Sequence, residues 1–112
     1  MESKIKLNNK MECMDIALLT LNDFDTLINN VFTIRVSDEV QLDAELVEVT
    51  KLNNYSPLER NPFSIVFRTD QKNEYYQQGI FTIIHPEKGN LELFLSPLGF
   101  DSVGMKYEAV FS

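Results

Sequence analysis

The chain has 112 residues, of which 44% are hydrophobic and 24% charged, and eight Phe and four Tyr supply bulky core material in the absence of Trp. This composition indicates one globular domain and excludes a disordered or fibrous chain. The formal net charge is −7. We therefore expect neither nucleic acid nor a membrane as a partner, because nucleic acids and anionic membranes are bound through clustered Lys and Arg.

Residues 1–17 are predicted to form a flexible N-terminal arm, because they are mostly polar and show no sustained period. Within them, Ile5–Leu7 is a candidate for a short edge strand. The arm holds no long apolar segment, so we expect no signal peptide and a cytoplasmic location, with export by a route without a classical signal left open. The single cysteine, Cys13, can form neither an internal disulfide nor a cysteine-based zinc site.

A short helix is predicted next, in the segment LTLNDFDTLINN (19–30). Thr20 or Asn22 can cap its first turn, which also carries acidic residues that suit the helix dipole. Asn29-Asn30 can end it, because Asn tolerates the left-handed backbone conformation. Its apolar face, at helical spacing, is predicted to consist of Phe24, Leu27 and Ile28.

From position 31 the hydrophobic period changes to two, which is typical of β-strands. The first two strands are predicted at 31–37 and 40–49. In the second strand the alternation slips by one residue at Leu46-Val47, which predicts a β-bulge and a strongly curved sheet. A long polar connection follows at 50–62.

Further strands are predicted at 63–69, 78–85, 91–96 and 105–111, with a loop at 97–104. Strand 78–85 is largely apolar on both faces, so we expect it to be central. Strands and helices do not alternate, which argues against a parallel sheet. The prediction is an all-β, mainly antiparallel fold: a single domain over 18–112, built as a small six-stranded barrel or curled sandwich, with one short N-terminal helix at an open end.

The sequence offers little for catalysis. His85 is the only histidine, and no second histidine or nearby cysteine supports it as a base or a metal ligand. Ser64 and Ser96 lack the glycine-flanked elbow of a serine nucleophile. We therefore predict a structural His85, no enzymatic activity, no cofactor, and no catalytic or metal-binding residue. Arg68 and Glu108 interrupt apolar strands and are predicted to form an ion pair if those strands are neighbours.

Two groups of residues are candidates for contact with another protein. The first group is acidic and lies in a stretch without a basic residue; its alternative role is a solvated outer face. The second group is apolar and lies in the predicted loop 97–104; its alternative role is packing across a barrel end. The acidic residues are Asp43, Glu45 and Glu48, and the apolar residues are Leu98, Phe100 and Val103.

The strings PFSIVFR, QQGIF, HPEKGNLELFLSPLG and YEAVF, in this order after the opening LTLNDF, resemble a family of small bacterial domains of unknown function (family of unknown function 6916). The resemblance covers 18–112. It implies a similar series of strands and an association with phage-tail-like proteins. The matching residues are mainly core and turn residues, so the resemblance implies no active site.

The leading hypothesis is a non-enzymatic protein-binding or assembly module, accessory to a phage-tail-like or secreted assembly. Its expected partner is another protein. A homodimer through an edge strand, with YEAVF (107–111) as the candidate, is also left open. The alternatives are a carrier that holds a small apolar ligand inside the barrel, and a hydrolase that uses His85.

Overall fold

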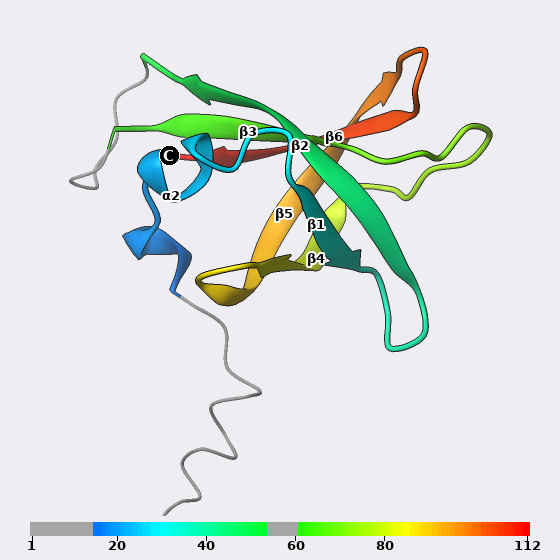
Figure 1. Ribbon diagram of the computed structural model, residues 1–112, viewed down its shortest axis with the longest axis horizontal. Coiled ribbons are helices and arrows are strands. Elements are labelled where there is room, and N and C mark those ends of the chain that lie inside the picture. Colours follow the sequence, from blue (N-terminus) through cyan, green and yellow to red (C-terminus); the bar gives the residue numbers. More distant parts are fainter. Residues whose placement is uncertain (1–14, 54–60) are drawn as a thin grey trace, which may run out of the picture.

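The computed structural model describes residues 15–53 and 61–112 (Figure 1). The helical elements are η1 (Ile16–Leu18), which is a 3-10 turn, and α2 (Asn22–Asp25). The strands are β1 (Val31–Arg35), β2 (Gln41–Lys51), β3 (Phe63–Arg68), β4 (Gly79–His85), β5 (Gly89–Phe100) and β6 (Met105–Phe111). The edge strand predicted at Ile5–Leu7, the residue Cys13 and most of the predicted connection 50–62 lie outside the described residues.

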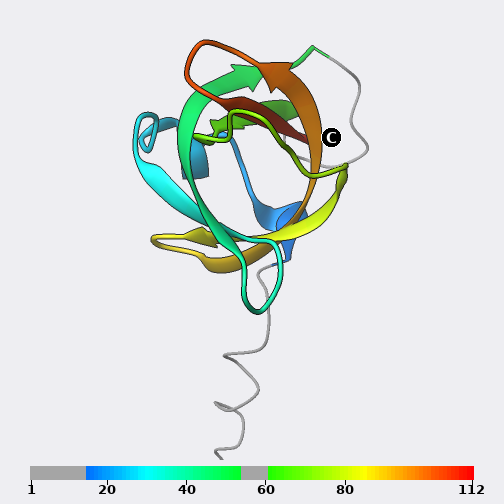
Figure 2. The ribbon, with the colours of Figure 1, turned by 90° about the vertical axis from the view of Figure 1, so that its right-hand side faces the viewer.

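The six strands close into a barrel in the order β1-β2-β3-β6-β5-β4, and every neighbouring pair is antiparallel. Figure 2 shows the strands as a ring. Alternate side chains point into this ring and are buried there, among them Phe32, Phe67, Leu93 and Tyr107. The predicted all-β antiparallel fold is confirmed, and the barrel is the architecture that these strands adopt.

The bulge predicted in β2 is also confirmed. The register with β3 pairs Leu46 with Phe67 and then resumes with Glu48 opposite Val66, so that Val47 is the extra residue. A bulge bends a strand and increases its twist. Both effects help a sheet of this size to curl and close.

β5 is longer than predicted. It runs to Phe100, whereas the sequence predicted a strand end at 96 and a loop over 97–104. Pro97 and Gly99 favour a loop, because proline donates no ladder hydrogen bond and glycine weakens a strand. In the structure the register with β6 shifts between these two residues, and Gly99 adopts a positive φ of 134°. The strand therefore continues through both residues, with a β-bulge between them.

β4 has a paired strand on each side, β1 and β5, as expected of a central strand, but its two apolar faces differ in burial. In a closed barrel each strand has two neighbours, but its outer face is left without a second layer. Ile83 points inward and is fully buried, whereas Ile80 on the outer face is 68% exposed.

α2 lies at one end of the barrel, beside the C-terminal end of β6 (Figure 1). Its first turn is held by Asp23, whose carboxylate accepts a 2.8 Å hydrogen bond from the backbone amide of Thr20, as in a capping box. The helix ends at Asp25, earlier than predicted. Asn29 adopts the expected left-handed conformation, with a φ of 79°.

Phe24 is the residue of α2 that packs into the barrel core. Its ring is fully buried, and its centroid lies 6.0 Å from that of Phe63 and 5.7 Å from that of Phe111. Leu27 also packs on the core. Ile28 was also predicted on this buried face but is 38% exposed, because a helix of one turn does not extend far enough to place it there.

Candidate functional site

His85 ends β4 and is buried beneath α2. Its Nε2 lies 2.7 Å from the carbonyl oxygen of Asp23, and its Nδ1 accepts hydrogen bonds from the backbone amides of Glu87 (3.0 Å) and Lys88 (3.1 Å). Because a carbonyl only accepts and an amide only donates, these contacts assign the proton of a neutral ring to Nε2. Both ring nitrogens thus bind backbone groups, and His85 clamps α2 to the turn after β4.

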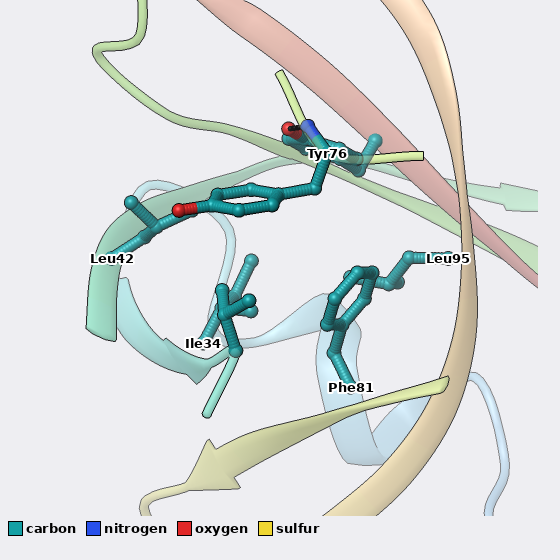
Figure 3. A pocket seen from close by; sticks show the side chains of 7 residues that line it. Ile34, Leu42, Tyr76, Phe81 and Leu95 are labelled. Atoms are coloured by element: carbon teal, nitrogen blue, oxygen red, sulfur yellow. Dashed lines mark hydrogen bonds between the residues drawn. The ribbon is translucent and has the colours of Figure 1, made fainter. Parts of the chain in front are cut away.

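The far end of the barrel is filled by side chains. Figure 3 shows Tyr76 lying across this end, above Ile34 and beside Leu42, with Phe81 next to them. The space that remains among these side chains is about 10 Å³. A drug-sized ligand needs roughly 300 Å³ or more, so this part of the barrel gives no support to the ligand-carrier hypothesis.

The loop 69–78 is pinned across this end by a polar network. The hydroxyl of Tyr107 donates a 2.7 Å hydrogen bond to Gln71 Oε1 and accepts one of 3.0 Å from the backbone amide of Tyr76. Thr69 Oγ1 bonds to the same Gln71 oxygen and to the carbonyl of Met105. Burial raises the pKa of the Tyr107 phenol above its ordinary value.

Asp101 organises the turn between β5 and β6. One of its carboxylate oxygens accepts hydrogen bonds from the backbone amides of Gly104 (2.9 Å) and Val103 (2.8 Å), and the other lies 3.1 Å from Arg68 Nη1. These two amide bonds, with Arg68 beside them, lower the pKa of the Asp101 carboxyl to about 2. The turn is therefore fixed by a charged side chain as well as by the strands.

The ion pair predicted between Arg68 and Glu108 does not form, and this prediction is wrong. β3 and β6 are neighbours, but their register places Val66 opposite Glu108. Arg68 instead lies between Asp101 and Glu45, with its Nη2 3.4 Å from Glu45 Oε1. Residues two apart on a strand point to the same face but lie about 7 Å apart, which is enough to change the ion-pair partner.

An apolar groove lies on one side of the β5–β6 hairpin and has a volume of about 280 Å³. The rings of Tyr75 and Phe100, which both line it, pack edge to face against each other, at 83° and with centroids 6.2 Å apart. About half of each of these side chains is exposed, as is half of Leu98. The apolar groove is lined by Tyr75, Pro97, Leu98, Gly99, Phe100 and Met105.

An acidic depression of about 190 Å³ is lined by residues from the same hairpin and from β1, β2 and β3. Among its lining residues are three carboxylates and one guanidinium. The acidic depression is lined by Val31, Asp43, Ala44, Glu45, Arg68, Thr69, Asp70 and Val103. The two hollows lie on opposite sides of the sheet, because Arg68 pairs with Lys106 whereas Phe100 pairs with Met105, and neighbouring residues of β6 point to opposite faces. We call the apolar groove the hairpin face.

Five of the six residues predicted for protein contact line one or other of these two hollows. Leu98 and Phe100 lie in the apolar groove, and Asp43, Glu45 and Val103 line the acidic depression. Glu48 lies apart, beyond the β2 bulge, where its carboxylate accepts a hydrogen bond from Thr50.

Sequence reasoning missed Tyr75 in the apolar groove, and Val31 and Asp70 in the acidic depression. No local pattern marks them, because the closure of the barrel and the path of the loop 69–78 bring them to the hairpin. A weak signal exists for Tyr75 alone, since it is a bulky residue within an otherwise polar connection, DQKNEYYQQ.

β6 lies between β3 and β5 in the barrel. In the segment YEAVF, Tyr107 and Glu108 pair with both neighbouring strands, whereas the register for 109–111 is with β3. A homodimer through this segment stays a prediction.

Among residues 15–53 and 61–112, no group of three or more metal-ligating side chains occurs. No described helix has the length and apolar character to cross a membrane.

The sequence was also compared with known proteins. The family model described as a domain of unknown function (DUF6916) matches residues 19–111. No significant match was found among curated proteins or among solved structures. The matched residues run from the segment before α2 to the end of β6 and include every strand of the barrel. The chain therefore belongs to this family of domains of unknown function.

Proposed function

We propose that this domain is a non-enzymatic protein-binding or assembly module, and that it contacts its partner through the hairpin face. The observation that carries the proposal is the exposure of bulky apolar side chains at one end of a barrel whose interior is filled. Leu98 is 50% exposed, and Tyr75 and Phe100 are each 47% exposed. Exposed apolar residues that gather on one surface are typical of protein contact sites.

The composition of the face supports the same proposal. Aromatic residues dominate the energetics of protein interfaces, and Tyr75 and Phe100 form the walls of the apolar groove. The pinned loop and the Asp101 turn hold these walls in place. A surface that is ordered before binding loses less conformational entropy on association.

The alternatives find less support in the described residues. A hydrolase based on His85 needs a ring nitrogen that faces a substrate, but both nitrogens bind backbone groups. A carrier needs an interior cavity, whereas the space beneath Tyr76 is about 10 Å³. Neither observation affects the hairpin face.

The family resemblance suggests the setting of the module, which is a phage-tail-like or secreted assembly. A net charge of −7 suits a partner with a basic surface. If the partner is basic, its binding weakens as salt rises, because exposed ion pairs are screened.

The proposal is tested by affinity capture of the tagged full chain from its own cells, read by mass spectrometry at low and high salt. Phe100→Asp is the test variant, since it places a charge in the apolar groove at a half-exposed position. Ile80→Asp is the matched control, because it makes the same kind of change at an exposed site on the outer wall of β4.

Reproducible capture of one protein by the wild type and by Ile80→Asp, but not by Phe100→Asp, supports the proposal. Undiminished capture by Phe100→Asp contradicts the assignment of the hairpin face. Loss with Ile80→Asp alone would move the contact to the outer wall, where Ile80 and Phe94 form an exposed cross-strand pair.

A further inference from the structure

The His85 clamp holds α2 on the end of the barrel through a ring that is neutral and 2% exposed. Nε2 donates to the carbonyl of Asp23 in α2, and Nδ1 accepts from the backbone amides of Glu87 and Lys88 in the turn between β4 and β5. Because Nδ1 is the acceptor for two amides, it has no place for a proton while the clamp is closed.

A proton on Nδ1 would turn this acceptor into a donor. The new N–H would face two amide N–H groups, whose nitrogens lie 3.0 and 3.1 Å away. Both hydrogen bonds would be lost, and donors would oppose each other across these distances. A ring released into water meets neither cost. The open clamp is therefore the form that accepts the proton.

The charged side chains of α2 and of the turn do not reverse this preference. Asp23 of α2 and Lys88 of the turn form an ion pair, with Oδ1 and Nζ 3.4 Å apart, so their opposite charges largely offset each other at the ring. Asp25 of α2 and Glu87 of the turn are partly or fully exposed to water, which screens their charges.

The two strands beside β4 place their charged side chains away from the ring. β1 meets the ring with Phe32, whose centroid lies 5.7 Å from that of His85. Arg35 of β1 and Glu92 of β5 both pair with Thr82, three residues before His85. Since side chains alternate along a strand, these two point to the other face of the sheet.

α2 depends on this clamp because it has little stability of its own. It has four residues, Asn22–Asp25, whereas an isolated helix needs roughly 12–15 residues to form in water. Its place is set by the buried ring of Phe24 and by the contacts of Asp23 with His85 and Lys88. The Phe24 ring itself packs edge-on against His85, at 5.3 Å.

We propose that the His85 clamp is sensitive to acid, and that the opening of α2 is coupled to the uptake of one proton on Nδ1. An imidazole in water takes up a proton below about pH 6.5, and a carboxylate below about pH 4.3. Between these limits the equilibrium constant for opening rises about tenfold for each unit by which the pH falls. The closed form is therefore favoured at neutral and alkaline pH and is lost in acid.

Opening changes the surface at this end of the barrel. The rings of Phe63 and Phe111 lie 6.0 and 5.7 Å from that of Phe24, and withdrawal of α2 uncovers them. Acid thus exposes apolar surface that the closed clamp keeps from water. This device is independent of the hairpin face.

The test uses the ¹⁵N-labelled full chain with a histidine-free tag, because His85 is the only histidine and gives one set of ring signals. Long-range ¹H–¹⁵N spectra report the tautomer and charge of the ring. Hydrogen exchange of the Glu87 and Lys88 amides, corrected for the intrinsic rate, reports the opening. Both are recorded from about pH 7.5 to about pH 5, a range that spans imidazole titration.

Two variants are compared with the wild type by urea denaturation over the same range. His85→Phe removes the titrating group and keeps a ring. Asp23→Asn removes the neighbouring charge and keeps the backbone carbonyl that binds the ring.

We expect a neutral ring with its proton on Nε2 at about pH 7.5, and amide protection that falls about tenfold per pH unit below about pH 6.5. The equilibrium constant for unfolding should rise by the same factor in the wild type and in Asp23→Asn. It should stay constant over this range in His85→Phe.

A ring that takes up its proton while the Glu87 and Lys88 amides stay equally protected would overturn the proposal, because the closed clamp then accommodates the cation. An acid dependence that persists in His85→Phe, or that disappears in Asp23→Asn, would also overturn it, since a carboxylate would then be the group that titrates. If His85→Phe does not fold, the ring spectra and amide exchange of the wild type decide the question.

Discussion

The clamp formed by His85 yields the sharpest stability prediction. His85→Ala removes the ring that binds the Asp23 carbonyl and the backbone amides of Glu87 and Lys88. It also removes the edge-on contacts of this ring with Phe24 and Phe32, whose centroids lie 5.3 and 5.7 Å away. The change therefore loosens α2 from the barrel and opens a cavity beneath it.

The expected magnitude follows from these contacts. A typical hydrogen bond contributes roughly 1 kcal/mol net, and an aromatic contact roughly 0.5–1.5 kcal/mol. Glu87 is exposed, so its amide regains water when the ring is lost, and the full sum is not reached. We expect His85→Ala to lower the free energy of unfolding by about 3–4 kcal/mol, a large part of the roughly 5–15 kcal/mol of a typical domain.

His85→Phe separates the two contributions, since it keeps a ring of similar size and loses only the hydrogen bonds. Its expected cost is about 2–3 kcal/mol. Both variants are measured by urea denaturation followed by circular dichroism, with an unchanged slope and a lower midpoint expected. A loss of less than about 1 kcal/mol in His85→Ala would refute the reasoning, because three part-buried hydrogen bonds and two ring contacts cannot cost so little if they hold the helix in place.

Three further predictions concern the turns and the pinned loop. Gly104→Ala should destabilise strongly, because the new Cβ would lie 1.8 Å from the Thr69 carbonyl oxygen, whereas Gly79→Ala, with nothing within 4 Å of its Cβ, should change the denaturation midpoint little. The pKa of the Asp101 carboxyl falls from 3.8 to about 2 on folding, so its contribution to stability is present above pH 4 and is lost as the pH falls through 2. The free energies of unfolding of wild type and Asp101→Asn, measured by urea titration, should therefore converge near pH 2. The raised pKa of Tyr107 means that its contribution is full below its ordinary pKa of 10.0 and is lost as the pH rises through the higher folded value, so Tyr107→Phe should lack this alkaline loss in thermal unfolding scans. A Tyr107→Phe protein with the same alkaline loss as the wild type would contradict that assignment.

The elements could be predicted from the sequence where the local signal and the tertiary environment agree. The period of two located all six strands, and the phase slip at Leu46-Val47 located the β2 bulge, because both patterns reflect which side chains face the core. The left-handed conformation of Asn29 was predicted because tolerance of positive φ is a property of the residue itself, although α2 ends earlier, at Asp25.

The errors arose where tertiary structure overrides a local signal. Pro97 and Gly99 were read as a loop, but the barrel keeps them in β5 by placing a bulge at that point. The suggested pairing of Arg68 with Glu108 was wrong, because no local pattern determines the register between two strands. The exposure of Ile80 could not be read from the sequence, because an apolar residue on an outer face cannot be distinguished there from one in the core.

The candidate site was predicted only in part, for a related reason. Leu98, Phe100 and Asp43 could be selected from sequence as apolar residues in a presumed loop and as acids without a basic neighbour. The grouping of the first two with Tyr75, and of Asp43 with Asp70, depends on the path of the loop 69–78, which is set by the hydrogen bonds of Tyr107 and Gln71. No local pattern in a single sequence predicts such long-range contacts.

The central claim, that the hairpin face binds a protein partner, is tested most directly by site-specific photo-crosslinking in the source cells. Benzoylphenylalanine is placed at position 100 in the groove and, as the control, at position 80 on the outer wall of β4, where Ile80 is more exposed (68%) than Phe100 (47%). A single discrete adduct from position 100, with none from position 80, is the result that the proposal predicts. Discrete adducts from position 80 with none from position 100 would contradict it.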